Sequence, residues 1–258
     1  MQRPSARLLP LIGAVLVLLV GGVIFFLDRD SDPKPVAAPV TTTAPRRTTT
    51  TAKPTPEGFM VADAAGPIVD LYSSPGVAYA EKPWLDNPTH EGLAVVFEVL
   101  EDGPEYLKVR VSSRPNGLEA YVKKDQVSVR YVPNRIQVEV GARRVTVFKG
   151  DTDEVLLQET VAVGRDRTPT PLGHFFVDGI VTLANDKGSY GSHQVSVSGF
   201  SEKLQSFQGG SGQIALHGTN RPDLLGQPIS NGCVRMTNDA ISRVAFLAPT
   251  GTPVEIVA

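Results

Sequence analysis

The sequence predicts a mostly β protein, in which an N-terminal transmembrane helix and a linker precede two β-rich domains, the second with one main helix. Three observations predict this class. An uncharged apolar run fills residues 8–27, a stretch rich in Thr and Pro follows it, and the rest of the 258-residue chain consists of short apolar runs between turn residues. The formal net charge of −2 argues against a nucleic-acid partner, because such a partner favours a strongly basic chain.

Residues 8–27 read "LLPLIGAVLVLLVGGVIFFL" and have the length of a membrane-spanning helix. At about 1.5 Å per residue they cover the roughly 30 Å hydrocarbon core of a bilayer. Arginines precede the run and aspartates follow it, so residues 1–7 are predicted to be a cytoplasmic tail. We therefore predict an uncleaved, single-pass signal anchor in the cytoplasmic membrane. A cleaved signal peptide is the alternative, although "FFLDRDSDP" offers no small residues at a cleavage site.

Residues 28–57 hold eight Thr and six Pro and no aromatic side chain. Such a segment buries too little apolar surface to fold, so we predict a disordered linker. At about 3.1 Å per residue it reaches at most ~90 Å, which would hold the following domains away from the membrane.

Residues 58–131 are predicted to form a small β-barrel. The run "LAVVFEVLEDGPEYLKVRV" alternates around an Asp-Gly-Pro turn, and "RPNGLEAYVKKDQVSV" gives a second turn followed by a strand. Short strands between frequent turns in a segment of this size indicate a barrel. The closing "EAYVKKDQV" resembles bacterial Src-homology-3-like domains. Trp84 and Tyr121 either form a binding face or pack in the core or rim, and no chemistry is assigned to this domain.

Residues 134–258 are predicted to form the second β-rich domain, beginning with a β-meander in "RIQVEVGARRVTVFKGDTDE". The later run "GQIALHG" is a strand that His217 closes, on the face opposite Ile214 and Leu216. The one clear helix begins after the N-cap Thr237. Its apolar positions follow helical spacing: Ile241, Val244, Ala245 and Ala248.

The chain contains one cysteine, Cys233, in a loop rich in Gly, Pro, Ser and Asn. In an exported protein it is a free reactive thiol, a site of intermolecular pairing, or an inert buried side chain. A thiol with an ordinary pKa of about 8.5 needs a nearby base or positive field before it attacks a carbonyl. We expect His217 to make this sulfur anionic if the intervening loop folds back. The nearest group that could orient the other ring nitrogen is the carbonyl of Gly218.

The neighbours of Cys233 suit a developing negative charge. Gly232 lets the backbone bend sharply, so that successive N–H groups at Asn231 and Gly232 can point at one oxyanion. Arg235 either holds a substrate carboxylate or makes a structural ion pair. Ser230 is a candidate substrate contact, although Ser230 and Asn231 can also simply shape the turn.

The stretch "HGTNRPDLLGQPISNGCVRM" resembles the catalytic motif of the L,D-transpeptidase family, in which a His before Gly or Ser pairs with a downstream Ser/Thr-x-Gly-Cys and often an Arg. The similarity extends through "GRDRTPTPLGHFFV" and "NDAISRVAFLAPTGTPVEI" and covers about residues 134–258. The resemblance implies a mostly β catalytic domain with Cys233 as nucleophile, His217 as base and Gly218 as its carbonyl partner. It also implies that Gly232 and Cys233 supply oxyanion N–H groups.

Many members of that family have His where this chain has Asn231. Because an amide has no titratable proton, proton transfer is expected to fall to His217. His193, in "GSHQVSVSGF", is a further candidate for lining the substrate groove. No two histidines lie at ligand-like spacing, so no metal site is predicted, and the family chemistry requires no cofactor.

The resemblance implies peptidoglycan stem peptides as donor and acceptor, on the cell-wall side of the membrane. Cys233 attacks a tetrapeptide donor, D-alanine leaves, and an acceptor amine resolves the thioester into a 3→3 cross-link that serves cell wall biogenesis and cell shape. It also implies a carbapenem target. Two alternatives remain open: a cysteine peptidase that cleaves stem peptides, and a non-catalytic wall-binding scaffold.

Overall fold

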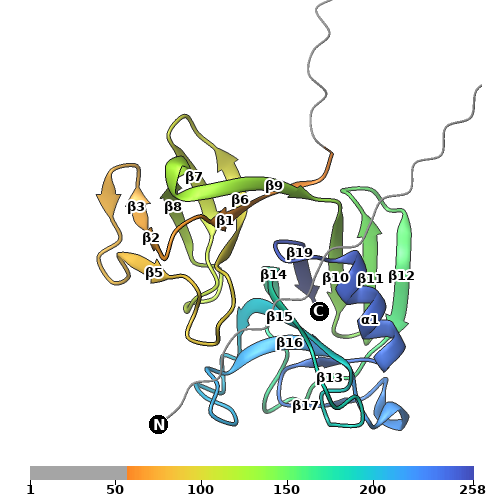
Figure 1. The fold of residues 1–258 in the computed structure, drawn as a ribbon. Coiled ribbons are helices and arrows are strands. Elements are labelled where there is room, and N and C mark those ends of the chain that lie inside the picture. The colour runs from red at the N-terminus through yellow and green to blue at the C-terminus, as the bar shows by residue number, and fades with distance from the viewer. Residues whose placement is uncertain (1–56) are drawn as a thin grey trace, which may run out of the picture. The chain divides into compact units, whose positions relative to one another are not determined.

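The computed structural model describes residues 57–258, which belong to one compact unit. The predicted cytoplasmic tail, anchor helix and nearly all of the linker lie outside these residues. Within residues 57–258, no helix combines the length and the apolar character that crossing a bilayer requires. This part of the chain is mostly β with a single α-helix, which confirms the predicted fold class for the described residues (Figure 1).

Residues 59–132, here called the N-terminal β region, form a seven-stranded antiparallel sheet in the order β4-β3-β8-β7-β6-β1-β9. A separate antiparallel ribbon pairs β2 with β5. The strands are β1 (Phe59–Ala64), β2 (Ile68–Asp70), β3 (Tyr72–Ser74), β4 (Val77–Ala78), β5 (Trp84–Asp86), β6 (Val96–Asp102), β7 (Tyr106–Arg110), β8 (Glu119–Lys123) and β9 (Val127–Val132). A 3-10 turn, η1 (Lys124–Gln126), joins β8 to β9.

Alternation of side chains fixes which face of these strands is buried. In β7, Leu107 and Val109 are fully buried, whereas their neighbours on the other face are partly exposed. The turn before β7 needs Gly103, because a Cβ there would lie 2.8 Å from the Tyr106 carbonyl oxygen. The predicted strands on either side of the Asp-Gly-Pro turn are therefore present as β6 and β7.

Residues 134–257, here called the C-terminal β region, form an eight-stranded mixed sheet in the order β12-β11-β10-β19-β14-β15-β16-β18. The pairs β10–β19 and β16–β18 are parallel, and the first three strands make the predicted antiparallel meander. The strands are β10 (Asn134–Glu139), β11 (Arg144–Lys149), β12 (Val155–Thr160), β14 (Gly173–Thr182), β15 (His193–Phe200), β16 (Gln213–His217), β18 (Val234–Arg235) and β19 (Pro253–Val257). A parallel two-stranded pair joins β13 (Val163–Gly164) to β17 (Pro228–Ser230), and η2 (Pro222–Leu224) is a 3-10 turn.

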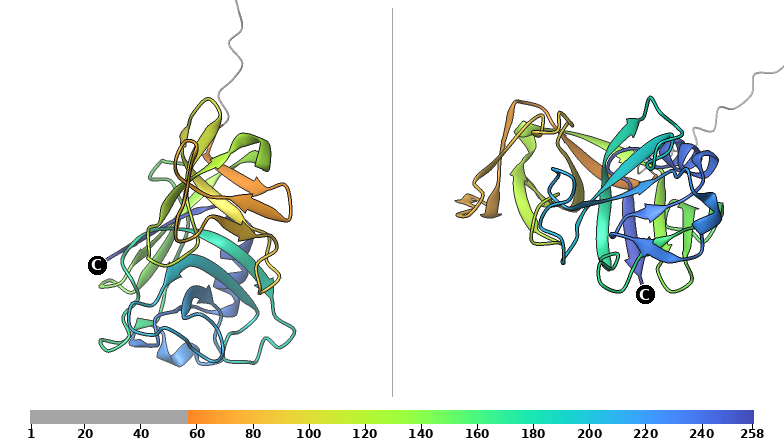
Figure 2. Two further views of the ribbon diagram at one scale, coloured as in Figure 1. Left: turned by 90° about the vertical axis from the view of Figure 1, so that its left-hand side faces the viewer. Right: turned by 90° about the horizontal axis from the view of Figure 1, so that it is seen from below.

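The large sheet curls around the single helix, α1 (Asn238–Leu247). The helix contacts β12 at one edge of the sheet and also β15 and β16 near the other edge, so the sheet must bend around it (Figures 1 and 2). One hydrophobic core runs between the helix and the concave face and includes Val147, Val195 and Ile241. Both faces of β16 are covered in this arrangement. Ala215 and His217 are therefore as buried as Ile214 and Leu216, which the sequence pattern did not indicate.

The helix itself confirms the sequence prediction. Thr237 is the N-cap, and its side chain accepts a hydrogen bond from the Ala240 N–H at 3.1 Å. The predicted apolar face packs inward, with Ile241 and Val244 fully buried. Two residues separate the start of this helix from the end of β18. Its packing in the core therefore fixes the position of β18, the strand that follows Cys233.

The two β regions meet through side chains on both. Val61, Val96 and Val132 of the N-terminal β region form a small buried cluster with Phe176 of β14. β9 ends at Val132 and β10 begins at Asn134, so a single residue separates the two sheets along the chain.

Candidate active site

Two neighbouring parallel strands bring His217 and Cys233 into one cavity. β16 ends at His217, and β18 begins at Val234, directly after Cys233. Leu216 pairs with Val234 in parallel register, so the intervening loop folds back and delivers Cys233 beside the end of β16. Both side chains line a cavity of about 240 Å³. The prediction that His217 and Cys233 act together depended on this loop folding back.

His217 is held in a defined tautomer by its own neighbour. Its side chain is buried, and Nδ1 lies 2.6 Å from the carbonyl oxygen of Gly218. A carbonyl oxygen only accepts hydrogen bonds, so in the neutral ring the proton resides on Nδ1 and the lone pair on Nε2. The hydrogen bond expected from the sequence is thus present, and it leaves one ring nitrogen able to take a proton.

The electrostatics favour a neutral resting pair. Burial lowers the pKa of His217 to about 4, against a smaller opposing effect of the Gly218 carbonyl, and the charge of Arg235 lowers it further. Burial raises the pKa of the Cys233 thiol, although a hydrogen bond with the Ala215 backbone and the charge of Arg235 act in the opposite direction. Both shifts favour the neutral forms of the two groups before substrate enters, so an anionic sulfur made by His217 remains a prediction for the attack itself.

Tyr190 is a site residue that the sequence did not single out. Its ring centroid lies 4.6 Å from that of His217 at an interplanar angle of 40°, and it lines the same cavity. Burial raises the pKa of its hydroxyl, and so does the nearby Cys233. Tyr190 lies in the loop between β14 and β15, in the polar segment "NDKGSYGS", whose sequence predicts only a loop. Its contact with His217 depends on how that loop folds over β16.

Tight backbone packing fixes this loop against the end of β16. A Cβ on Gly218 would lie 2.3 Å from Asn238 Oδ1 and 3.0 Å from the Cα of Gly191, so no side chain fits there. Asn238 Oδ1 accepts a hydrogen bond from the Ser192 N–H at 3.2 Å, and Asn238 Nδ2 donates to the Asp186 carbonyl at 2.9 Å. The first residue of α1 therefore ties the Tyr190 loop to the residue whose carbonyl orients His217.

Residues 230–233, here called the nucleophile loop, are held by buried hydroxyl groups. Ser230 Oγ donates to the Cys233 carbonyl at 2.6 Å and accepts from the Gly232 N–H at 3.0 Å. Thr170 Oγ1 donates to the Gly232 carbonyl at 2.9 Å and accepts from the Gly164 N–H at 2.9 Å. The Gly232 N–H, a predicted oxyanion donor, is donated to Ser230 Oγ in this structure, so its oxyanion role stays a prediction. Ser230, fully buried, shapes the turn.

Arg165 supports the same loop from the segment "GRDRTPT". Its backbone N–H and its Nε both donate to the Ser230 carbonyl, at 3.2 and 3.1 Å. Its Nη2 donates to Asn231 Oδ1 at 3.0 Å. Asn231, which lines the cavity, is thereby engaged through its side-chain oxygen.

Arg235 lines the cavity beside the reacting pair. Its Nε atom is buried and has no hydrogen-bond partner among residues 57–258, and no carboxylate of that range forms an ion pair with it. The sequence left two interpretations of Arg235, a structural ion pair or a contact with a substrate carboxylate. Within the described residues no carboxylate pairs with Arg235, so the structure does not support the first. A guanidinium that faces a cavity without an acceptor is suited to bind an anionic group that enters it.

His193 does not line the catalytic cavity. It begins β15, and its Nδ1 lies 3.1 Å from the hydroxyls of both Ser192 and Ser242, next to α1. The structure thus gives the predicted substrate contact of His193 no support. Among residues 57–258, no three His, Cys, Asp or Glu side chains gather in a way that could hold a metal ion.

The residues of this site lie within a segment that matches a known protein family. The family described as the YkuD L,D-transpeptidase catalytic domain matches residues 133–256. YkuD of Bacillus subtilis strain 168, which carries the name of an L,D-transpeptidase, is 31% identical over 125 residues, covering 48% of this chain and 66% of that protein. YkuD of Bacillus licheniformis is 30% identical over the same length, with the same coverage. This chain therefore spans slightly less than two thirds of the curated relatives it matches.

Among solved structures, an L,D-transpeptidase from Mycobacterium smegmatis is similar with a TM-score of 0.40 and 15% sequence identity. The match covers 74% of this chain and 99% of that one. The family match begins at residue 133, so the N-terminal β region lies outside it.

Proposed function

We propose that this protein is an L,D-transpeptidase that forms 3→3 cross-links between peptidoglycan stem peptides, because residues 133–256 match the L,D-transpeptidase catalytic-domain family. One observation carries the proposal. The only cysteine of the chain and a histidine whose Nε2 has no hydrogen-bond partner within residues 57–258 line the same cavity, and Nδ1 of that histidine is bonded to the Gly218 carbonyl. A thiol, a base and a group that orients the base are the parts that acyl transfer needs.

In the first half-reaction the Cys233 thiol attacks the carbonyl carbon of the third residue of a tetrapeptide donor. The thiol proton passes to Nε2 of His217 as the S–C bond forms, since both groups are neutral at rest. The tetrahedral intermediate then collapses, the C–N bond breaks, and His217 returns the proton to the leaving amine of D-alanine. The product is a thioester on Cys233.

In the second half-reaction the side-chain amine of another stem peptide attacks the thioester carbonyl. His217 takes a proton from this amine, the C–S bond breaks, and the thiolate of Cys233 recovers a proton from the imidazolium. The new bond is an amide between the two stems. No metal or organic cofactor enters either half-reaction.

Arg235 and the Cys233 backbone supply the remaining interactions. The terminal carboxylate of the donor lies one residue beyond the scissile bond, within reach of a guanidinium in the same cavity, so we assign its recognition to Arg235. The oxyanion is assigned to the Cys233 N–H, since the Gly232 N–H is already donated to Ser230. One such donor contributes about 3 kcal/mol to the barrier of an acyl transfer.

We further propose that residues 8–27 anchor the protein in the cytoplasmic membrane, with the catalytic domain on the cell-wall side. The support is the uncharged run and the Thr- and Pro-rich segment after it. The N-terminal β region is proposed to be a Src-homology-3-like domain, which its short antiparallel strands and their order permit.

The first test is intact-protein mass spectrometry of the full-length protein after incubation with a carbapenem. We expect one covalent adduct on the wild type, none on Cys233→Ala, and a much slower adduct on His217→Gln, whose amide cannot accept the thiol proton. An adduct that persists in Cys233→Ala would overturn the proposed nucleophile.

The second test is product analysis with a tetrapeptide donor and an amine acceptor. New cross-linked dimer with release of D-alanine is the expected result. Hydrolysis alone would favour the cysteine peptidase alternative. Wall binding that survives Cys233→Ala, without any turnover of the wild type, would favour the non-catalytic scaffold.

A further inference from the structure

One wall of the catalytic cavity is a long, irregular connection. Residues 201–212, here called the wall segment, join β15 to β16 and contribute Leu204, Phe207 and Gln208 to the cavity. Most of the segment between Glu202 and Gly210 is exposed, and it has few hydrogen bonds of its own. Across the cavity, Gln208 Oε1 lies 3.5 Å from the Tyr190 hydroxyl. The position of the wall segment therefore sets the width of the cavity opposite Tyr190.

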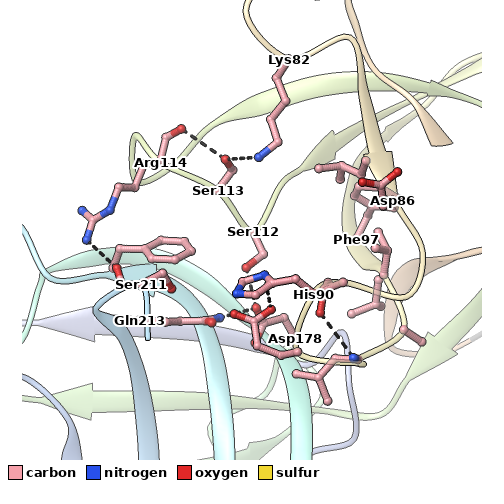
Figure 3. A pocket seen from close by; sticks show the side chains of 18 of the residues that line it. Lys82, Asp86, His90, Phe97, Ser112, Ser113, Arg114, Asp178, Ser211 and Gln213 are labelled. Carbon is pink, nitrogen blue, oxygen red and sulfur yellow. Dashed lines mark hydrogen bonds and ion pairs between the residues drawn. The ribbon is translucent and has the colours of Figure 1, made fainter. Parts of the chain in front are cut away.

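The wall segment is tied down by Arg114, which belongs to the N-terminal β region. Arg114 Nη1 donates to the Ser201 carbonyl at 2.9 Å, and Nη2 donates to the carbonyls of Leu204 and Ser211 at 3.0 and 3.1 Å. Figure 3 shows the guanidinium reaching from the loop between β7 and β8 to Ser211. A planar guanidinium can hold several carbonyls at once, and hydrogen bonds from a charged donor are stronger than neutral ones.

The surrounding residues are shaped to this contact. Asn116, from the same loop, donates to the Phe200 carbonyl and accepts from the Phe200 N–H, both at 2.8 Å, at the base of the wall segment. The Arg114 guanidinium carbon lies 5.1 Å from the centre of the Phe200 ring. Gly212 has φ +75°, and a Cβ there would lie 2.3 Å from the Leu204 carbonyl oxygen and 3.2 Å from Arg114 Nη2. The segment closes over the guanidinium because residue 212 has no side chain.

The other face of the wall segment borders a second cavity, of about 480 Å³, between the two β regions (Figure 3). Arg114, Ser211 and Gln213 line it, and Gln213 lines the catalytic cavity as well. With solvent-accessible space on both sides, the wall segment has little packing of its own to hold it. The segment has bonds of its own, such as those from the Lys203 and Leu204 N–H groups to Ser201 Oγ. From outside, Arg114 holds it by three hydrogen bonds, and Asn116 holds Phe200 directly before it.

We propose that Arg114 is a positioning residue for the transpeptidase reaction: by holding the wall segment, the N-terminal β region shapes the substrate-binding side of the catalytic cavity. The substrates named in this inference rest on the proposed function, whereas the contact between Arg114 and the wall segment does not. Arg114 does not touch the reacting atoms, so its loss should affect substrate affinity more than the chemistry of Cys233. Misplacing a binding wall by about 1 Å can cost up to a hundredfold in rate.

Arg130 provides a matched control. It also lies in the N-terminal β region and reaches the C-terminal β region, where Nη2 donates to Thr250 Oγ1 at 3.0 Å. It also pairs with Asp63 at 2.6 and 2.9 Å. Thr250 lies between α1 and β19, and neither Arg130 nor Thr250 lines the catalytic cavity. Arg130→Ala therefore removes a contact between the two regions and leaves the wall segment intact.

The experiment compares full-length wild type, Arg114→Ala, Arg114→Lys and Arg130→Ala in three measurements. Hydrogen exchange of the amides of residues 201–212 measures directly how firmly the wall segment is held. Steady-state kinetics with the tetrapeptide donor separates KM from kcat. Alkylation of Cys233 by iodoacetamide reports the reactivity of the thiol towards a molecule too small to need the wall.

Arg114→Ala is expected to speed exchange in the wall segment and to raise KM about tenfold, with kcat and alkylation within about twofold of the wild type. Arg114→Lys should fall in between, because an ammonium cannot hold three carbonyls in the same fixed geometry. Arg130→Ala should leave all three readouts of the site unchanged. Wild-type exchange and KM in Arg114→Ala would overturn the proposal, and so would equal effects of Arg130→Ala.

Failure of this inference and failure of the proposed function give different results. If the wild type makes no cross-link, the transpeptidase assignment fails, whereas hydrogen exchange still decides whether Arg114 holds the wall. If Arg114→Ala does not fold, Arg114→Lys and Asn116→Ala take its place. Both must then speed exchange in residues 201–212, or the proposal is wrong.

Discussion

The nucleophile loop and the wall segment border the same cavity but are held in opposite ways. The nucleophile loop is fixed by buried hydroxyls of Thr170 and Ser230, both within the C-terminal β region. The wall segment is largely exposed, and three of its carbonyls are held by Arg114 of the other β region, while Asn116 holds Phe200 directly before it. Cys233 is thus positioned by its own β region, whereas the wall segment on the other side of the cavity is positioned by the N-terminal β region.

This difference separates two tasks. Small displacements of a nucleophile relative to its base abolish attack, so a buried and fully satisfied network is appropriate there. Under the proposed function the wall segment has to admit two stem peptides, and a segment held at a few points by an outside group can move without disturbing the chemistry. Changes near the nucleophile should therefore lower kcat, whereas changes at the wall should raise KM.

Gly218→Ala should give the largest effect. The new Cβ would lie 2.3 Å from Asn238 Oδ1 and 3.0 Å from the Gly191 Cα, so the backbone must shift. That shift moves the carbonyl that orients His217 and the loop that carries Tyr190. We expect kcat to fall about a hundredfold or more, measured as D-alanine release. Gly66→Ala, with nothing nearer than 3.8 Å, is the control, and an active Gly218→Ala would mean that the local network tolerates displacement.

The pH dependence of stability should report the burial of His217. The unfolded chain binds a proton at this residue below about pH 6.5, whereas the folded protein binds it only below about pH 4. Between these values the unfolded state holds more protons, so folding stability should fall as the pH falls, by up to about 3 kcal/mol.

Chemical denaturation of wild type and His217→Gln at pH 7 and pH 4.5 measures this contribution as the difference between the two proteins. The wild type should lose more stability on acidification than the variant, whose side chain does not titrate. Equal losses would show that His217 is not desolvated in solution, and the neutral resting pair would then have to be abandoned.

Thr170→Val tests the buried support of the nucleophile loop. The isosteric change leaves the Gly164 N–H and the Gly232 carbonyl without their shared partner, which should cost about 1–3 kcal/mol of stability. We expect kcat to fall about tenfold with KM little changed, in kinetics below the unfolding temperature. Thr252→Val is the control, because its buried hydroxyl only donates to the Pro249 carbonyl within a distant turn. A similar fall of kcat in the control would point to general destabilisation.

The parts of this site that depend on neighbouring residues could be predicted from the sequence, whereas the contacts made by residues far away in the chain could not. The Gly-Cys turn, the strand that His217 closes and the helix capped by Thr237 all depend on residues close in sequence, and each was predictable. The hydrogen bond from the Gly232 amide to Ser230, two residues away, was not predicted, because either residue could serve the turn or the substrate. Arg114 could not be found, because it acts on carbonyls 87 to 97 residues away and backbone carbonyls leave no mark in the sequence. The direction of both pKa shifts depends on burial of the pair, which the order of the residues does not reveal.

Asn231→Ala should have the smallest effect on kcat. It tests whether the side chain of Asn231 matters to the nucleophile loop as much as the buried hydroxyls do. Asn231 accepts one hydrogen bond from Arg165, whose other two bonds to the Ser230 carbonyl remain after the substitution. We therefore expect kcat to stay within about threefold of the wild type, since the loop keeps its buried hydroxyl bonds and proton transfer is assigned to His217.

Asn231→His introduces the residue that many members of the resembled family have at this position. In a His217→Gln background it should give no activity. A rescued double variant would show that position 231 can act as the base, and His217 would lose its assigned role as the only proton carrier.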